Sequence, residues 1–152
     1  MASPSLNEFI APEAITFGHF ESFLEASEAA GDLLVSSGLV LKSYVDEILE
    51  IIQTKGPYMV IAPSVAIVHG RPSDSVIKTG ASVIIDREGV FSGNEKNDPV
   101  RVIIAISAKD DAAHLQMLTA IAEVFSQPKA VENLVNCSSS GEVLDAFSIN
   151  LT

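Results

Sequence analysis

Four short apolar runs between residues 58 and 107 constrain the fold of this chain most strongly. Turn residues separate the runs, which are YMVIA (58–62), VAIV (65–68), GASVIID (80–86) and VRVIIAIS (100–107). The last two runs are rich in β-branched residues, which favour extended backbone. We therefore expect each of the four runs to form a β-strand.

Helical patterns lie on both sides of these runs. Before them, the spacing of apolar residues predicts a helix over residues 21–36 and a second one from Ser43 to Gly56. Ser43 and Asp46 have the spacing of a capping box, which would start the second helix. The order helix, helix, strands, then helices again predicts an α/β fold, although it does not give the order or direction of the strands.

Three helices are expected after the strands. The longest covers residues 110–126, with a core stripe of Leu115, Leu118, Ile121, Ala122 and Phe125. A shorter helix should open at Pro128, because proline is tolerated in a first turn. Ser139 and Glu142 predict the start of the last helix, which contains EVLDAF.

Composition restricts the class of protein further. The length of 152 residues predicts one domain over residues 1–152. The net charge of −11 repels phosphate backbones, so we expect no nucleic-acid partner. Cys137, the single cysteine, excludes an internal disulfide and fits a reducing compartment. The beginning MASPSLNEF lacks signal-peptide features, and no apolar run approaches the ~20 residues of a membrane helix, so we expect a cytoplasmic protein.

The familiar motifs of metal and nucleotide chemistry are absent from the sequence. It contains no HExxH, no Cys-x-x-Cys, no Gly-x-Ser-x-Gly elbow, no Walker loop and no dinucleotide fingerprint. The three histidines, His19, His69 and His114, are too far apart in sequence for a local metal clip, and a zinc site built from all three is disfavoured. We expect neither a metal nor a cofactor.

His69 has the most suggestive setting of the three histidines. It ends the apolar run of APSVAIVHGRP (62–72), with Gly70, Arg71 and Pro72 directly after it. A neutral imidazole can act as a nucleophile and carry a phosphoryl group, and a guanidinium such as that of Arg71 suits phosphate. A strand-end histidine bonded to backbone, beside a solvated arginine, explains the same residues equally well. The residues of this stretch leave both interpretations open.

The remaining candidates carry less chemical information. His114 lies in the first turn of the 110–126 helix and shares a face with Leu118, so it is a half-buried packing residue or a neutral hydrogen-bond partner for a strand-end group. Nothing beside His19 in sequence supports chemistry, and we interpret it as a surface or turn residue. Cys137 has no basic neighbour in sequence, which favours a bystander thiol.

Two stretches taken together resemble a known family. APSVAIVHGRP and HLQMLTAIAEVF (114–125) resemble the histidine motif and the second-histidine helix of the enzyme IIA domain, mannitol/fructose class (type 2), of the bacterial sugar phosphotransferase system. The tracts 44–72 and 97–114 and the ending GEVLDAF are more similar to the ascorbate-specific branch. The resemblance covers nearly the whole chain. It implies a mixed β-sheet of about five strands, flanked by helices on both sides.

The resemblance also implies a mechanism. Phosphorylated HPr would transfer its phosphoryl group to His69, as a tele-phosphohistidine, and His69 would pass it to a cysteine of a cognate IIB component. A membrane IIC permease would then use it for uptake of L-ascorbate or a related carbohydrate. His114 would stabilise the phosphoryl group as the family's second histidine. Oligomeric state does not follow, and a homodimer stays open.

The chain departs from the family pattern at two positions. Val68 replaces the proline that usually precedes the active histidine, and Gln53 occupies the place of an arginine on the second helix. We hypothesise that Arg71 supplies the missing charge. Two other functions remain: a regulatory, nitrogen-type IIA-like protein that senses phosphorylation state, and a small α/β binding domain without chemistry.

Overall fold

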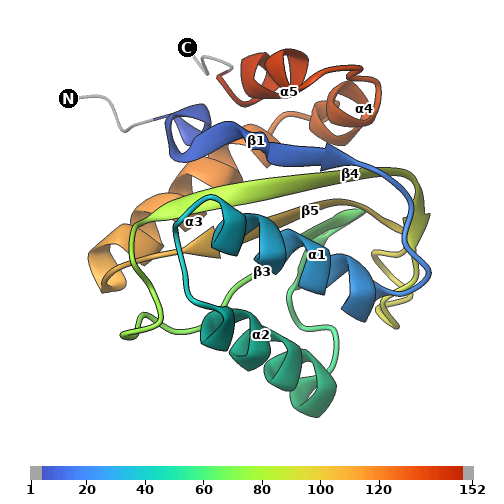
Figure 1. Cartoon of the computed structure of the whole chain (residues 1–152). Helices are drawn as coiled ribbons and strands as arrows, with labels where there is room; N and C mark the ends of the chain where they lie inside the picture. The colour runs from blue at the N-terminus through green and yellow to red at the C-terminus, as the bar shows by residue number, and fades with distance from the viewer. Residues whose placement is uncertain (1–4, 149–152) are drawn as a thin grey trace.

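A five-stranded mixed β-sheet forms the centre of the molecule, which the computed structural model describes over residues 5–148 (Figure 1). The strands lie side by side in the order β1-β4-β5-β3-β2. In chain order the elements are η1 (Leu6–Phe9), β1 (Ile10–Phe17), α1 (Phe23–Ser36), α2 (Lys42–Lys55), β2 (Val60–Ala62), β3 (Val65–Val68), β4 (Gly80–Val90), β5 (Val100–Ser107), α3 (Asp111–Phe125), α4 (Ala130–Val135) and α5 (Ser140–Phe147).

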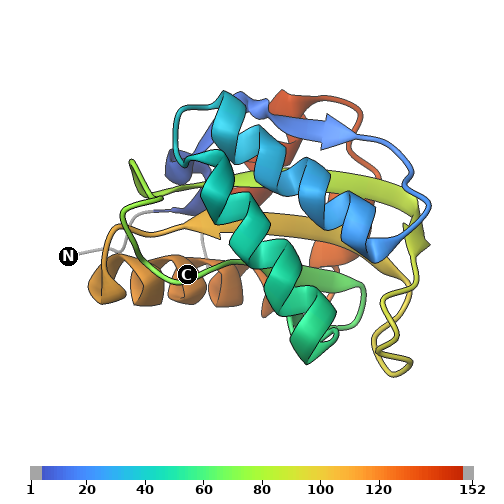
Figure 2. The same cartoon turned by 60° about the horizontal axis from the view of Figure 1, so that its bottom comes forward.

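Helices cover both faces of the sheet. Helices α1 and α2 lie on one face, and α3, α4 and α5 lie on the other (Figures 1 and 2). Strand β3 shows how this is encoded, because its side chains alternate between the two cores: Ala66 and Val68 pack toward α1 and α2, whereas Val65 and Ile67 pack toward the other layer. The expected α/β fold, with about five strands flanked by helices on both sides, is confirmed.

Strand direction decides which loops meet. Strand β3 pairs with β5 in parallel, and β1 pairs with β4 in parallel, whereas β4 and β5 are antiparallel. Therefore the C-terminal ends of β3 and β5 lie along one edge of the sheet, and those of β1 and β4 lie along the opposite edge. Here an edge is the row formed by the ends of the strands. Each edge gathers segments that are far apart in sequence.

The predicted strands agree well with the observed ones, apart from β1. The runs at 65–68 and 100–107 coincide with β3 and β5, and β4 extends beyond its expected end at Asp86 to Val90. Strand β1 was not predicted. Its sequence IAPEAITF contains Pro12 and Glu13, which disfavour a strand. However, β1 is an outermost strand of the sheet, where a proline that donates no hydrogen bond to a neighbouring strand is tolerated.

Helix α2 begins within one residue of its predicted start at Ser43, but not with the predicted cap. Its first residue is Lys42, and Leu41 before it makes no side-chain cap, so the capping box expected from Ser43 and Asp46 is wrong. The hydroxyl of Ser43 instead lies 2.6 Å from that of Ser75, in the loop that follows the His69 segment. The Ser43 hydroxyl therefore joins α2 to that loop.

The buried stripe of α3 agrees with the prediction in part. Ile121 is buried and Leu118 and Phe125 pack partly buried against the core, whereas Leu115 and Ala122 are exposed, and the fully buried residues are Met117, Ala120, Ile121 and Val124. Both sets have the i, i+3, i+4 spacing of one helix face, so periodicity alone did not distinguish them. In the shorter helices, α4 begins at Ala130 and not at Pro128, whereas the N-cap expected at Ser139 is confirmed by its bond from the Glu142 amide. No helix within residues 5–148 is long and apolar enough to cross a membrane.

Candidate functional site

The structure brings His69 and His114 together. His69 directly follows β3, and His114 lies in the first turn of α3, which the chain enters shortly after β5. Because β3 and β5 are parallel, both segments leave the sheet at the same edge. The two imidazole rings lie 5.3 Å apart between centroids, at an angle of 53°. Residues 45 positions apart in sequence thus form one histidine pair.

The ring of His69 is held in one tautomer. Its Nδ1 lies 2.9 Å from the carbonyl oxygen of Ile67, so Nδ1 carries the proton and donates it to that oxygen. Nε2 then keeps its lone pair. Burial, the largest effect, lowers the pKa of His69 below its ordinary value, and the nearby His114 lowers it further, while the bond to Ile67 acts in the opposite direction. Neutral His69 therefore has the properties of a nucleophile at pH 7.

A cavity of about 280 Å³ adjoins the histidine pair. Its walls come from the end of α2, the turn before β2, the loop after β3 and the start of α3. The residues that line it are Ile51, Lys55, Tyr58, His69, Gly70, Arg71, Pro72, Asp111 and His114. The cavity is large enough for a phosphoryl group, and the exposed side chain of Tyr58 forms part of its wall.

Two cations line this cavity. Arg71 lies there as the sequence predicted, and Lys55 joins it from the last turn of α2. Within the described part of the chain, neither side chain forms an ion pair with a carboxylate. Gln53 does not line the cavity, whereas Lys55 is four residues after Ile51 and shares its face. Sequence reasoning missed Lys55, because helical spacing does not say which face meets the histidines.

The start of α3 brings a helix N-terminus and a carboxylate to the cavity. Asp110 caps this helix by accepting a hydrogen bond from the Ala113 amide at 2.8 Å. The first turn, which holds Asp111 and His114, lines the cavity. A helix N-terminus favours an anion, whereas the Asp111 carboxylate acts against one, so Arg71 and Lys55 are the groups that favour a negatively charged ligand most clearly.

Val68, which stands where the family has proline, is an ordinary strand residue. It is fully buried and stands in register with Ala105 of β5. The strand thus continues in regular pairing up to the residue before His69. The substitution leaves the imidazole at the end of a rigid element.

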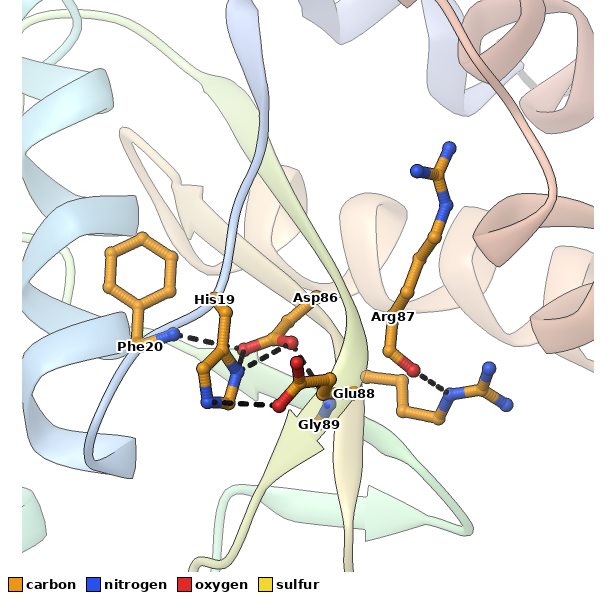
Figure 3. A network of polar contacts seen from close by, with 7 residues as sticks. His19, Phe20, Asp86, Arg87, Glu88 and Gly89 are labelled. Carbon is orange, nitrogen blue, oxygen red and sulfur yellow. Dashed lines mark hydrogen bonds and ion pairs between the residues drawn. The ribbon is translucent and has the colours of Figure 1, made fainter.

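His19 belongs to a different place in the molecule (Figure 3). It follows β1, at the edge opposite His69, and its Nδ1 lies 3.0 Å from both carboxylate oxygens of Asp86. Its Nε2 lies 3.4 Å from Glu88. Asp86 is fully buried and also accepts hydrogen bonds from the amides of Phe20 and Gly89. The expectation of a surface or turn residue is met by an exposed His19 in the segment after β1, but its partners on β4 were not visible in the sequence.

The other candidates stay apart from the histidine pair. No group of three potential metal-binding side chains converges anywhere in residues 5–148. Cys137 is buried, and its thiol donates to the carbonyl of Asn133 at 3.2 Å. Burial, the largest effect, raises the pKa of this thiol, which agrees with a bystander role.

Comparison with known proteins adds a family to this geometry. The family model described as "Phosphoenolpyruvate-dependent sugar phosphotransferase system, EIIA 2" matches residues 8–149. The chain belongs to this family. Its members are phosphotransferases that pass phosphoryl groups within the sugar phosphotransferase system, so family membership gives this chain a phosphocarrier role.

Relatives of two kinds support the assignment. The ascorbate-specific EIIA component of Escherichia coli K12 is 35% identical over 126 residues, 82% of each chain, and that of Salmonella typhimurium is 36% identical over 122 residues, 80% of this chain and 79% of the relative. Among solved structures, the cryptic mannitol-specific enzyme IIA of Escherichia coli superposes with a TM-score of 0.84 at 27% identity, over 95% of this chain and 99% of the other.

A complex has also been solved for a similar protein. Mannitol enzyme IIA of Escherichia coli, determined together with phosphorylated enzyme IIB, matches with a TM-score of 0.81 at 29% identity, over 91% of this chain and 96% of the other. The nitrogen regulatory protein IIA of Neisseria meningitidis, at 23% identity and a TM-score of 0.73, shares the fold.

Proposed function

We propose that Nε2 of His69 accepts a phosphoryl group from phospho-HPr and then transfers it to the cysteine of a cognate IIB component. The observation that carries this proposal is the histidine pair, with Nδ1 of His69 bonded to Ile67 and Nε2 left as the free nucleophile. Nε2 forms a bond to phosphorus as the bond from phosphorus to the donor nitrogen breaks. The ring then gains positive charge, which the carbonyl of Ile67 stabilises through the proton on Nδ1.

His114, Arg71 and Lys55 hold the transferred group. His114 donates a hydrogen bond to a phosphoryl oxygen, and the two cations offset the charge that accumulates on the other oxygens. Their place around one cavity supports these roles. In this proposal Lys55 shares with Arg71 the part that the family pattern assigns to the Gln53 position.

The carrier serves uptake of L-ascorbate or a related carbohydrate through a IIC permease, and it works in the cytoplasm. The support is the 35% identity to ascorbate-specific components over most of the chain. The complex of a similar mannitol enzyme IIA with phosphorylated IIB supports a IIB acceptor. Tyr58 lines the cavity, Leu115 follows His114 in α3, and both exposed side chains offer apolar surface for the two partners in turn.

Phosphoryl transfer can be followed directly. The protein is incubated with labelled phosphoenolpyruvate, enzyme I and HPr, and label should appear on the wild type and be absent from His69→Ala. His114→Ala should be labelled more slowly, whereas His19→Ala, which changes a histidine at the other edge, should match the wild type. Labelling of His69→Ala at the wild-type rate would refute the proposed acceptor.

Onward transfer separates the alternative functions. The labelled protein is mixed with purified IIB proteins of the ascorbate and mannitol types. Rapid loss of label to the ascorbate-type IIB supports the transport role. Labelling without transfer to either IIB favours the regulatory alternative, and absence of any labelling favours a binding domain without chemistry.

A further inference from the structure

The hydroxyl of Tyr44 joins the two strand ends from which the histidines project. Its oxygen accepts a hydrogen bond from the amide of Gly70 at 2.9 Å and donates one to the carbonyl of Ile106 at 2.7 Å. Gly70 directly follows His69, and Ile106 lies at the end of β5, just before the turn into α3. One side chain of α2 thus connects the His69 loop with the strand that leads to His114.

This hydroxyl is well suited to a fixed bridge. Tyr44 is almost fully buried in the core between α2 and the sheet. Burial, the largest effect, raises the pKa of Tyr44 to about 12, so the hydroxyl keeps the proton that it donates to Ile106. The ring is held by packing, and the two bonds are short, so the oxygen allows little change in the separation of the two strand ends.

The packing around Gly70 shows how closely α2 approaches this loop. A side-chain carbon at position 70 would lie 2.5 Å from a carboxylate oxygen of Glu47 and 3.1 Å from a ring carbon of Tyr44. The Glu47 carboxylate is the end of a flexible, partly exposed side chain and can turn away, so the contact with the packed Tyr44 ring is the tighter restriction. Glycine at position 70 lets the backbone approach the ring and hydroxyl of Tyr44 without that contact.

We propose that the Tyr44 hydroxyl is a positioning group for phosphoryl transfer, because it fixes the His69 loop relative to the strand that carries α3 and His114. This inference rests on the proposed function. Two reactive groups lose up to about a hundredfold in rate when they are misplaced by about 1 Å. A hydroxyl that touches neither the histidines nor the phosphoryl group thus affects transfer through the backbone on both sides.

Tyr44→Phe tests this role, with Ser82→Ala as its matched control. Ser82 is also fully buried, and its hydroxyl donates to the carbonyl of Ala30 in α1 at 2.7 Å, so it bonds neither the His69 loop nor the end of β5. Both variants lose one buried hydroxyl, so both should lose stability. We expect Tyr44→Phe to be labelled by phospho-HPr about tenfold to a hundredfold more slowly than Ser82→Ala.

A second readout does not depend on transfer at all. Titration of the imidazole signals by NMR reports the surroundings of His69 in the unphosphorylated protein. In Tyr44→Phe the loosened loop admits water, so the pKa of His69 should rise toward its ordinary value, whereas Ser82→Ala should leave it unchanged. A wild-type rate together with an unchanged His69 titration in folded Tyr44→Phe would overturn the inference.

A subtler change covers the case in which Tyr44→Phe does not fold. Incorporation of 3,5-difluorotyrosine into Tyr58→Phe places the analogue only at Tyr44, since the chain has two tyrosines. Fluorination makes the hydroxyl a better donor and a poorer acceptor while the ring stays in place. Compared with unfluorinated Tyr58→Phe, a changed transfer rate and His69 titration support the bridge, and identical values contradict it. If the wild type is not labelled at all, the proposed function is refuted. The NMR titration of His69 would still show whether the Tyr44 hydroxyl holds the His69 loop in place.

Discussion

Replacement of Asp86 by alanine should destabilise the protein strongly, although this residue lies at the edge opposite the histidine pair. The carboxylate is fully buried and accepts hydrogen bonds from the Phe20 amide at 3.1 Å, the Gly89 amide at 2.9 Å and His19 Nδ1 at 3.0 Å. A buried donor left without an acceptor costs about 1–3 kcal/mol. The Gly89 amide is buried, whereas water can partly reach that of Phe20. We therefore expect a loss of about 2–4 kcal/mol in the free energy of unfolding.

Urea unfolding followed by circular dichroism measures this loss from the shift in midpoint at constant slope. His19→Ala and Glu88→Ala are the matched controls, because each removes one side chain of the same network but leaves the amides of Phe20 and Gly89 bonded to Asp86. Both should cost clearly less than Asp86→Ala. If Asp86→Ala lowers the free energy of unfolding by less than about 0.5 kcal/mol, or by no more than His19→Ala, then the hydrogen bonds from the Phe20 and Gly89 amides do not account for the stabilisation by Asp86.

Three further outcomes follow from the same structure. The bond to Asp86, the largest effect, raises the pKa of His19 above 6.5. The stabilisation from this ion pair is therefore complete below pH 6.5 and is lost as pH rises through the raised pKa. In urea unfolding, His19→Ala should destabilise the protein more at pH 6 than at pH 9, and an equal effect at both would contradict the ion pair. Burial lowers the pKa of His69 below 6.5, so its labelling rate should fall with decreasing pH at a midpoint below 6.5, once the donor's own pH dependence is subtracted. A midpoint at or above 6.5 would show that the ring is not shielded. Gly31→Ala places a carbon 2.9 Å from a methyl group of Val45. Strain of about 1–3 kcal/mol should exceed the gain of about 1 kcal/mol in helix propensity, so the melting temperature should fall. The double variant with Val45→Ala should lose less stability than the two single variants added together, and simple additivity would exclude the clash.

The central strands and the histidine pair are the parts that sequence reasoning predicted best. VAIV and VRVIIAIS form β3 and β5 with the expected bounds because both are continuous apolar runs, buried on both faces. Strand β1 escaped prediction because its pattern is interrupted by Pro12 and Glu13, and its place in the sheet depends on pairing with β4.

The parts of the site that could not be predicted depend on contacts between distant segments. His19 and Asp86 are 67 residues apart, and Tyr44 and Gly70 are 26 residues apart. Lys55 lies near the histidines because the last turn of α2 lines the same cavity as the loop that follows β3. Local sequence patterns carry no information about contacts between distant segments. Only the family resemblance predicted that His69 and His114 act together.

The close approach of α2 to the His69 loop also restricts how relatives of this chain can diverge. A carbon at position 70 would meet Glu47 and Tyr44 at 2.5 and 3.1 Å. The Glu47 carboxylate can turn toward solvent, so a substitution of Gly70 mainly requires a shift of the Tyr44 ring or a smaller residue at position 44. Positions 44 and 70 should therefore change together among homologues, and this covariation should be strongest where the tyrosine hydroxyl is lost.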